Sequence, residues 1–195
     1  AVPVALTLKV AFAGTVTLVV RDGKVAYLEA VGAQDREAGA VMQPDSIFRI
    51  ASMTKAVVSV GIMMLVEEGR LSIADPVSRY IPGFARTTVL GTQNGRVAVV
   101  PATRAITIRD LLTHTAGISY GAGALEPWYS EAGFTQWYFA DRSEPMTVWI
   151  DKLATLPFDS QPGERWVYGY NTDILGNVIE RISGQTLADF IGQRI

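Results

Sequence analysis

The sequence predicts an α+β fold, in which strands come first along the chain and helices follow. Two runs rich in β-branched residues flank Arg21-Asp22-Gly23-Lys24, and Asp-Gly is a strong hairpin signal, so residues 14–31 predict a β-hairpin. Residues 52–69 and 172–182 predict helices, each with a glycine at or just beyond its end, and a short helical stretch is expected up to Ile195. Because strands and helices do not alternate, a parallel sheet is disfavoured.

The composition suits one soluble globular domain, or a large piece of one. Hydrophobic residues make up 49% of the 195 positions, which is enough apolar mass for a core, and the net charge is −2. Positive charge is not concentrated anywhere, so we expect no nucleic-acid partner. The absence of cysteine excludes thiol chemistry, and a single histidine argues against a His/Cys zinc site. We therefore expect neither a metal nor a cofactor.

The largely apolar residues 1–20 do not read as a membrane segment. Pro3 and Lys9 interrupt them, and the charged start and cleavage pattern of a signal peptide are missing. The alternation over residues 15–19 favours a strand. We expect no stable membrane association, and the location stays open between bacterial cytoplasm and periplasm, a processed secreted protein included.

Local signals predict two further elements. Asn94-Gly95 lies between short apolar runs and predicts a second hairpin over residues 88–100. Thr107 is followed three residues later by Asp110, a capping pair that predicts a helix over residues 107–114.

The segment from Gly117 to Trp149 is rich in glycine and aromatic residues. One interpretation is a satellite core beneath a long loop. The other is an aromatic wall of an apolar ligand pocket. On the second interpretation, Tyr120 and Trp128, together with Tyr170 further along the chain, are candidate substrate-binding residues.

The chemistry of the sequence centres on Ser52-Met53-Thr54-Lys55, where a hydroxyl and an amine lie one helical turn apart and can meet on one face. The pair opens helix 52–69, which is apolar on almost every face between Ala56 and Val66 and is therefore predicted to be buried. The helix dipole disfavours a cation in the first turn, and burial favours the neutral amine. We expect Lys55 to be an uncharged base with a lowered pKa that activates Ser52 as nucleophile.

Two competing interpretations concern the serines. In the first, Ser52 only caps the helix while Lys55 extends to solvent. In the second, Gly117-Ile118-Ser119-Tyr120-Gly121 is a nucleophile elbow, a motif that needs a strand before it and a histidine downstream. The single histidine, His114, lies upstream. We interpret Ser119 as a turn residue and His114 as a structural histidine that bonds a loop carbonyl.

Three segments carry motifs in a fixed order, residues 49–55, 108–118 and 162–168, the last reading Pro-Gly-Glu-Arg-Trp-Val-Tyr. Together they resemble the serine β-lactamase and penicillin-binding-protein superfamily, most closely class C β-lactamases and the family VIII carboxylesterases. The matching runs from about Gly14 to the end of the chain. The resemblance implies a β-lactamase/transpeptidase-like fold, with an antiparallel sheet flanked by helices and a helical region.

The resemblance also implies roles. Ser52 is the nucleophile, Lys55 its base, and Tyr168 carries protons to the leaving group and from the deacylating water. Without the resemblance, Tyr168 would be interpreted as a core aromatic residue. The family's usual Tyr-x-Asn is replaced here by Tyr168-Gly169-Tyr170, with Asn171 one place late. Esterase members often lose that asparagine, so hydrolysis of carboxylic esters is favoured over a β-lactamase or D-alanyl-D-alanine peptidase.

A third motif of the family, Lys-Thr-Gly or a His-x-Gly or Trp-x-Gly variant on a C-terminal strand, does not follow Tyr168. We interpret residues 1–195 as the N-terminal part of a single domain: hairpin 14–31, nucleophile helix 52–69, and a mostly helical region over 70–195. The expected partners are a small-molecule ester or amide and a C-terminal fragment of the same domain on a separate chain. An acylated sensor and an inactive homologue or fragment stay open as non-enzymatic alternatives.

Overall fold

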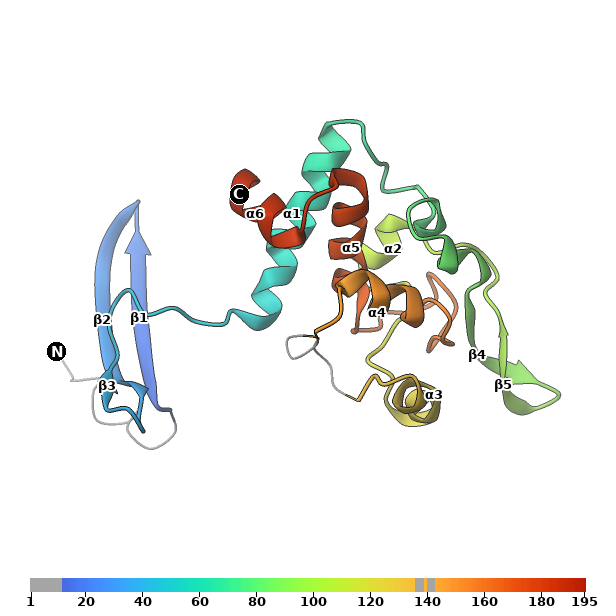
Figure 1. The fold of residues 1–195 in the computed structure, drawn as a ribbon, viewed down its shortest axis with the longest axis horizontal. Helices are drawn as coiled ribbons and strands as arrows, with labels where there is room; N and C mark the ends of the chain where they lie inside the picture. The colour runs from blue at the N-terminus through green and yellow to red at the C-terminus, as the bar shows by residue number, and fades with distance from the viewer. Residues whose placement is uncertain (1–11, 136–138, 140–142) are drawn as a thin grey trace. The chain divides into compact units, whose positions relative to one another are not determined.

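The chain divides into two compact units, Ala1–Ala51 and Ser52–Ile195. The computed structural model describes residues 12–135, 139 and 143–195. Strands make up the first unit, and helices with one hairpin make up the second (Figure 1). The α+β class predicted from the sequence is confirmed.

The first unit is an antiparallel sheet in the order β1-β2-β3, formed by β1 (Gly14–Arg21), β2 (Lys24–Asp35) and β3 (Ala40–Val41). Asp22 and Gly23 join β1 to β2 with φ values of 52° and 71°. Both values are positive, as the favoured two-residue hairpin turn requires. The first predicted hairpin is therefore confirmed, and its second strand runs longer than expected.

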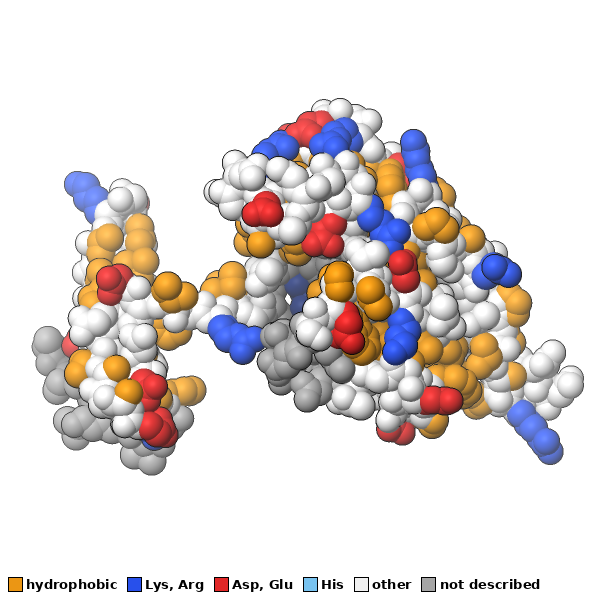
Figure 2. All heavy atoms as spheres, in the orientation of Figure 1, with side chains coloured by type: hydrophobic (Ala, Val, Ile, Leu, Met, Phe, Trp, Pro, Cys, Tyr) orange, Lys and Arg blue, Asp and Glu red, His pale blue; other side chains and the backbone are white. Residues whose placement is uncertain are grey.

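Apolar side chains of this sheet are exposed within their own unit. Successive residues of a strand point to opposite faces, so the apolar run at residues 18–20 is exposed on both faces of the sheet. The exposed fractions lie between 39% and 62% for Leu18, Val19, Val20, Val25, Tyr27 and Leu28, and Figure 2 shows apolar side chains along this unit. A sheet usually covers at least one face with another layer, and the described part of this unit contains none.

Helix α5 is the centre of the second unit, because it contacts α1, α2, α4 and α6 (Figure 1). No helix in the described part of the chain is long and apolar enough to span a membrane. The α-helices are α1 (Thr54–Glu67), α2 (Ile108–Leu112), α3 (Glu126–Glu131), α4 (Met146–Leu153), α5 (Asn171–Ser183) and α6 (Leu187–Arg194). Short 3-10 turns are η2 (Ala51–Met53), η3 (Val77–Arg79), η4 (Pro82–Arg86) and η5 (Gly123–Leu125), and the hairpin pairs β4 (Thr88–Gln93) with β5 (Arg96–Pro101).

The local signals of the sequence correspond to observed elements. Asn94 and Gly95 form the turn between β4 and β5, with φ values of 53° and 74°. Thr107 caps α2: its hydroxyl accepts from the Asp110 backbone N–H, and the Asp110 carboxylate accepts from the Thr107 backbone N–H. The predicted second hairpin and the predicted capping pair are both confirmed.

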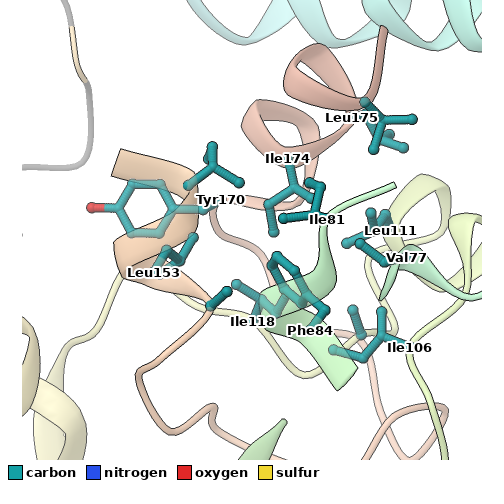
Figure 3. Packing of buried hydrophobic residues seen from close by; sticks show 14 of the residues in the cluster. Val77, Ile81, Phe84, Ile106, Leu111, Ile118, Leu153, Tyr170, Ile174 and Leu175 are labelled. Atoms are coloured by element: carbon teal, nitrogen blue, oxygen red, sulfur yellow. The ribbon is translucent and has the colours of Figure 1, made fainter. Parts of the chain in front are cut away.

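One apolar cluster fills the second unit, as the labelled side chains in Figure 3 illustrate. Tyr129, Phe134 and Trp149 belong to this same cluster, with exposed fractions of 0%, 5% and 6%. The prediction of a separate satellite core under residues 117–149 is therefore wrong, because these rings pack into the main core. Trp137 and Tyr138 of that segment lie outside the described residues.

Helix α1 is buried along one face only. The prediction that it is buried on every side is wrong for the described residues, because α5 and α6 cover one face while Val60 and Met63 remain 49% and 42% exposed. Gly61 lies where a Cβ would come within 3.2 Å of Ile179 and Phe190, so its small size permits the close approach of α5 and α6. The buried positions are Val58, Gly61, Ile62 and Leu65.

Candidate active site

Ser52 lies in the 3-10 turn just before α1 and is exposed. It is not the cap of the helix: Met53 occupies that position. Ala51, directly before Ser52, has a φ of 45°, a left-handed conformation that a non-glycine residue seldom adopts. Such strain is characteristic of functional sites, and here it sets the orientation of the serine.

The side chains of Lys55 and Tyr168 both contact the Ser52 hydroxyl. Lys55 Nζ donates to Ser52 Oγ over 3.2 Å, and the Tyr168 hydroxyl donates to the same oxygen over 2.7 Å. Lys55 reaches it because positions i and i+3 share a helix face, as predicted. Tyr168 comes from the loop before α5, far along the sequence. The sequence-predicted trio of Ser52, Lys55 and Tyr168 is thus brought together.

The predicted uncharged amine is contradicted. Burial acts to lower the pKa of Lys55, but hydrogen bonding to Tyr168 and the nearby Tyr120 and Asp173 outweigh it, so the pKa is raised. Conversely, the interaction with Lys55, followed by that with Ser52, lowers the pKa of Tyr168. Burial is the largest single effect on the pKa of Lys55, but the opposing effects of Tyr168, Tyr120 and Asp173 together exceed it. The pKa of Lys55 is thus raised where the sequence predicted a lowered value, and the pKa of Tyr168 is lowered.

Aromatic rings surround the Tyr168 side chain. His114 stacks against it at a centroid distance of 5.0 Å and an interplanar angle of 28°, and Trp166 does so at 5.7 Å and 23°. Tyr120 meets the ring edge-on at 5.8 Å, and Lys55 Nζ lies 4.8 Å from the ring centroid. Tyr120 thus lies beside Tyr168, and its predicted contact with a substrate stays a prediction.

Asp173, in the first turn of α5, adds a carboxyl group to the electrostatics of this cluster. Burial raises its pKa to about 6, against the opposing effect of Lys55. Asp173 in turn contributes to the raised pKa values of Lys55 and Tyr120. One signal in the sequence marks this residue, an acidic side chain at a helix start, which by itself indicates only a favourable dipole interaction.

Burial contradicts the predicted substrate contact of Tyr170, whereas that of Trp128 stays a prediction. Tyr170 is fully buried and packs its ring against Tyr120, Phe134 and Phe139; Figure 3 shows it among core side chains. Its role as a direct substrate contact is therefore wrong. Trp128 is 41% exposed on α3, outside the group of described rings that surround Tyr168.

The loop that carries Tyr168 is fixed to residues 114–121 by backbone contacts. Val167 N–H donates to the His114 carbonyl over 2.7 Å, and Gly163 N–H donates to the Thr115 carbonyl over 2.7 Å. A Cβ at position 169 would lie 2.4 Å from the Ile118 carbonyl oxygen, so glycine is required there. These contacts hold Tyr168 at a defined distance from α1.

The Ser119 side chain stabilises the turn in which it lies, as predicted. Its hydroxyl accepts from the Gly121 backbone N–H over 3.1 Å. The segment before it is α2 rather than a strand, so the context that a nucleophile elbow requires is missing.

Among the described residues, no group of three or more histidine, cysteine, aspartate or glutamate side chains could hold a metal ion.

Comparison with known proteins identifies the family. Residues 6–195 match the family model described as Beta-lactamase. The chain belongs to the beta-lactamase family. The resemblance inferred from the motifs and the fold expected from it are therefore confirmed.

Similar proteins of this family include esterases. The chain is 39% identical to an uncharacterised Mycobacterium tuberculosis protein over 93% of the chain, and 36% identical to Esterase EstB of Burkholderia gladioli over 90%. Among solved structures it is similar to EstCE1, a hydrolase with promiscuous acyltransferase activity, with a TM-score of 0.77 and 30% identity over 94% of the chain. The chain spans only 44%, 42% and 45% of these three proteins' own lengths.

The family motifs led to Ser52, Lys55 and Tyr168, but sequence reasoning missed other residues around them. Trp166 belongs to the motif before Tyr168 and was not assigned a role, although it is 64% exposed beside that ring. His114 was expected to bond a loop carbonyl through its side chain. Instead its ring nitrogen lies 3.0 Å from the Asn171 amide, a contact between positions far apart in the sequence.

Proposed function

We propose that the complete domain hydrolyses carboxylic esters through a covalent acyl-enzyme on Ser52. The observation that carries the proposal is that Ser52 Oγ lies within hydrogen-bond reach of both Lys55 Nζ and the Tyr168 hydroxyl. A serine hydroxyl is a poor nucleophile until a neighbouring base takes its proton. Two candidate bases converge on this one oxygen.

In the proposed mechanism, Tyr168 in its phenolate form is the base and Lys55 is the cation that stabilises it. This assignment follows the lowered pKa of Tyr168 and the raised pKa of Lys55, and it replaces the lysine base expected from the sequence. Ser52 Oγ bonds to the acyl carbon while its proton passes to Tyr168. The bond to the alcohol oxygen then breaks, and Tyr168 returns the proton to the leaving alcohol.

Deacylation repeats these transfers with water. Tyr168 takes a proton from the attacking water, whose oxygen bonds to the acyl carbon. The bond to Ser52 Oγ breaks, the serine recovers its proton from Tyr168, and the carboxylic acid leaves. The backbone N–H of Ser52 is the proposed donor to the oxyanion.

Esters are proposed over lactams because the asparagine near Tyr168 is not free to hold the side-chain amide of a lactam. Asn171 is fully buried, and its amide nitrogen donates to the Ile118 and Val167 carbonyl groups. Two similar proteins are named as an esterase and a hydrolase. The alternative is a β-lactamase or D-alanyl-D-alanine peptidase, which nitrocefin turnover exceeding p-nitrophenyl butyrate turnover would favour.

We also propose that a C-terminal part of the same domain, which can be a separate chain, completes the site. Support comes from the exposed apolar faces of the β1–β2 hairpin and of α1, and from the coverage of less than half of the similar proteins.

An acylated sensor is the non-enzymatic alternative. It is indicated if a penicillin forms a stable adduct on Ser52 without turnover.

The test is ester hydrolysis by the complete domain and two serine variants. Ser52→Ala is expected to lower kcat/KM by at least about 10³-fold, because it removes the nucleophile. Ser119→Ala is the matched control and should retain most of the activity, since that hydroxyl only accepts from a turn N–H. The opposite pattern would favour the nucleophile elbow at Ser119.

A further inference from the structure

We propose that Asn171 and His114 form a positioning pair for Tyr168, in which Asn171 fixes the imidazole as its neutral Nε2–H tautomer and the imidazole holds the phenol ring. This inference deepens the proposed function and rests on it for the role of Tyr168. The two residues come from different segments, the start of α5 and the turn after α2.

The orientation of the Asn171 amide fixes the protonation of His114. Asn171 Nδ2 lies 3.1 Å from the Ile118 carbonyl oxygen, 3.2 Å from the Val167 carbonyl oxygen and 3.0 Å from His114 Nδ1. Carbonyl oxygens only accept, so the NH₂ group, and not the amide oxygen, must face this side. A proton on His114 Nδ1 would point at that NH₂ group. His114 Nδ1 therefore carries no proton and shares the two amide hydrogens with the two carbonyl oxygens, which places the ring proton on Nε2.

The imidazole in turn contacts the catalytic phenol. The two rings stack at 5.0 Å with an interplanar angle of 28°. The backbone supports the stack, since the Val167 N–H, one residue before Tyr168, donates to the His114 carbonyl over 2.7 Å. His114 itself has a left-handed φ of 56°, which directs both its carbonyl and its ring toward the Tyr168 loop.

The charges around the ring also favour the neutral form. Burial lowers the pKa of His114, and the charge of Lys55 lowers it further. Tyr168 faces the imidazole directly, and Tyr120 and Asp173 complete the titratable groups of the cluster around Lys55. A proton on His114 would place a second cation beside the Lys55 ammonium and break the contact with Asn171. Tyr168 would then lose its support.

The protonation half of the proposal is tested by NMR of the complete domain with ¹⁵N-labelled histidine. His114→Asn, which suits the left-handed backbone, identifies the His114 signals by their loss. We expect the Nε2–H tautomer and a titration midpoint below the ordinary value of 6.5. Asn171→Asp should raise this midpoint, because a carboxylate there accepts from a protonated Nδ1. An Nδ1–H tautomer, or a midpoint at or above 6.5 in the unmodified domain, would overturn the proposal.

The positioning half is tested by kinetics per active site, with Ser52 counted by a fluorophosphonate so that misfolded protein does not contribute. His114→Asn removes the stacked ring, and kcat is expected to fall about 10- to 100-fold with little change in KM, as for a misplaced catalytic group. His114→Phe keeps a ring and should recover most of kcat. Unchanged kcat in His114→Asn contradicts a positioning role. If the unmodified domain lacks esterase activity, the proposed function fails, while the NMR result still decides the state of the pair.

Discussion

At the scale of single residues, the site depends on which of two neighbours of Ser52 carries the proton. Lys55 sits in the first turn of a helix, where sequence reasoning expects a neutral amine. Burial lowers the pKa of the amine, but Tyr168, Tyr120 and Asp173 together raise it, while Lys55 and then Ser52 lower the pKa of Tyr168. The proposed phenolate form of Tyr168 therefore requires a positively charged Lys55.

This exchange of roles predicts a specific pH dependence. Ester hydrolysis should fall as the pH falls through the lowered pKa of Tyr168, since protonation removes the base. Lys55→Ala removes the cation, so the pKa of Tyr168 should return toward its ordinary value of 10.0 and the acid limb of kcat/KM should shift to higher pH. Lys55→Arg keeps a cation and should shift the limb less.

The measurement is kcat/KM against pH for the complete domain and both Lys55 variants, with Lys152→Ala as a control at an exposed lysine. Equal loss of activity in Lys55→Arg and Lys55→Ala, without any shift of the acid limb, would contradict the ammonium role. That result would restore the neutral amine as base.

The side chains that meet as the sequence predicted are those whose contacts are local or whose positions belong to a motif. Ser52 and Lys55 meet because of helix geometry alone, and Tyr168 was found through its motif. Tyr170 was assigned wrongly because two tyrosines separated by one glycine do not reveal which ring faces the core. The contact of His114 with Asn171 joins two distant segments, so no local pattern indicates it.

At the scale of elements, short-range chemistry determined most of what the sequence predicted. Asp-Gly and Asn-Gly turns, the Thr107 cap and the glycine after α5 were all found where expected, because each depends on a few neighbouring residues. The burial of α1 could not be predicted from its composition. How many faces are covered depends on the other elements that pack against it, among which α5 and α6 cover one face within the second unit.

The cap of α2 predicts a pH-dependent stability. Asp110 is buried and accepts two hydrogen bonds from Arg104, at 2.6 and 2.9 Å, as well as those from Thr107. Burial acts to raise the pKa of Asp110, but Arg104 and Thr107 outweigh it and lower the pKa. The stabilisation is therefore present above the ordinary value of 3.8 and is lost as the pH falls through the lowered value.

Asp110→Asn should lower the free energy of unfolding by about 2–4 kcal/mol at neutral pH, because Arg104 loses its charged partner. Asp189→Asn is the matched control, since Thr186 and Asp189 form a similar but exposed cap on α6. It should cost less than about 1 kcal/mol. Chemical denaturation of the complete domain checks both values, and equal losses would show that the buried ion pair contributes nothing beyond the cap.

At the scale of the whole molecule, each of the two units has apolar surface that the other elements of its own unit do not cover. The β1–β2 hairpin is apolar on both faces within its unit, and α1 exposes Val60 and Met63. Large exposed apolar surfaces mark contacts with other parts of a protein. The proposed C-terminal part supplies such a cover.

Val60→Asp is therefore expected to destabilise the complete domain by about 2–4 kcal/mol, because it would bury a charge at a covered position. Val97→Asp, at a position on β5 that is 72% exposed, is the control and should change stability by less than about 0.5 kcal/mol. Thermal or chemical unfolding of the two variants measures the difference. Equally small effects would show that this face of α1 stays in contact with solvent.

The central claim is that Ser52 is the residue that takes the acyl group. Its most direct test is mass spectrometry of the complete domain after reaction with a fluorophosphonate, followed by mapping of the modified peptide. We expect one adduct, on the peptide that contains Ser52. It should be absent in Ser52→Ala, and it should form more slowly in Tyr168→Phe. An adduct on Ser119, or a folded domain that forms no adduct, would contradict it.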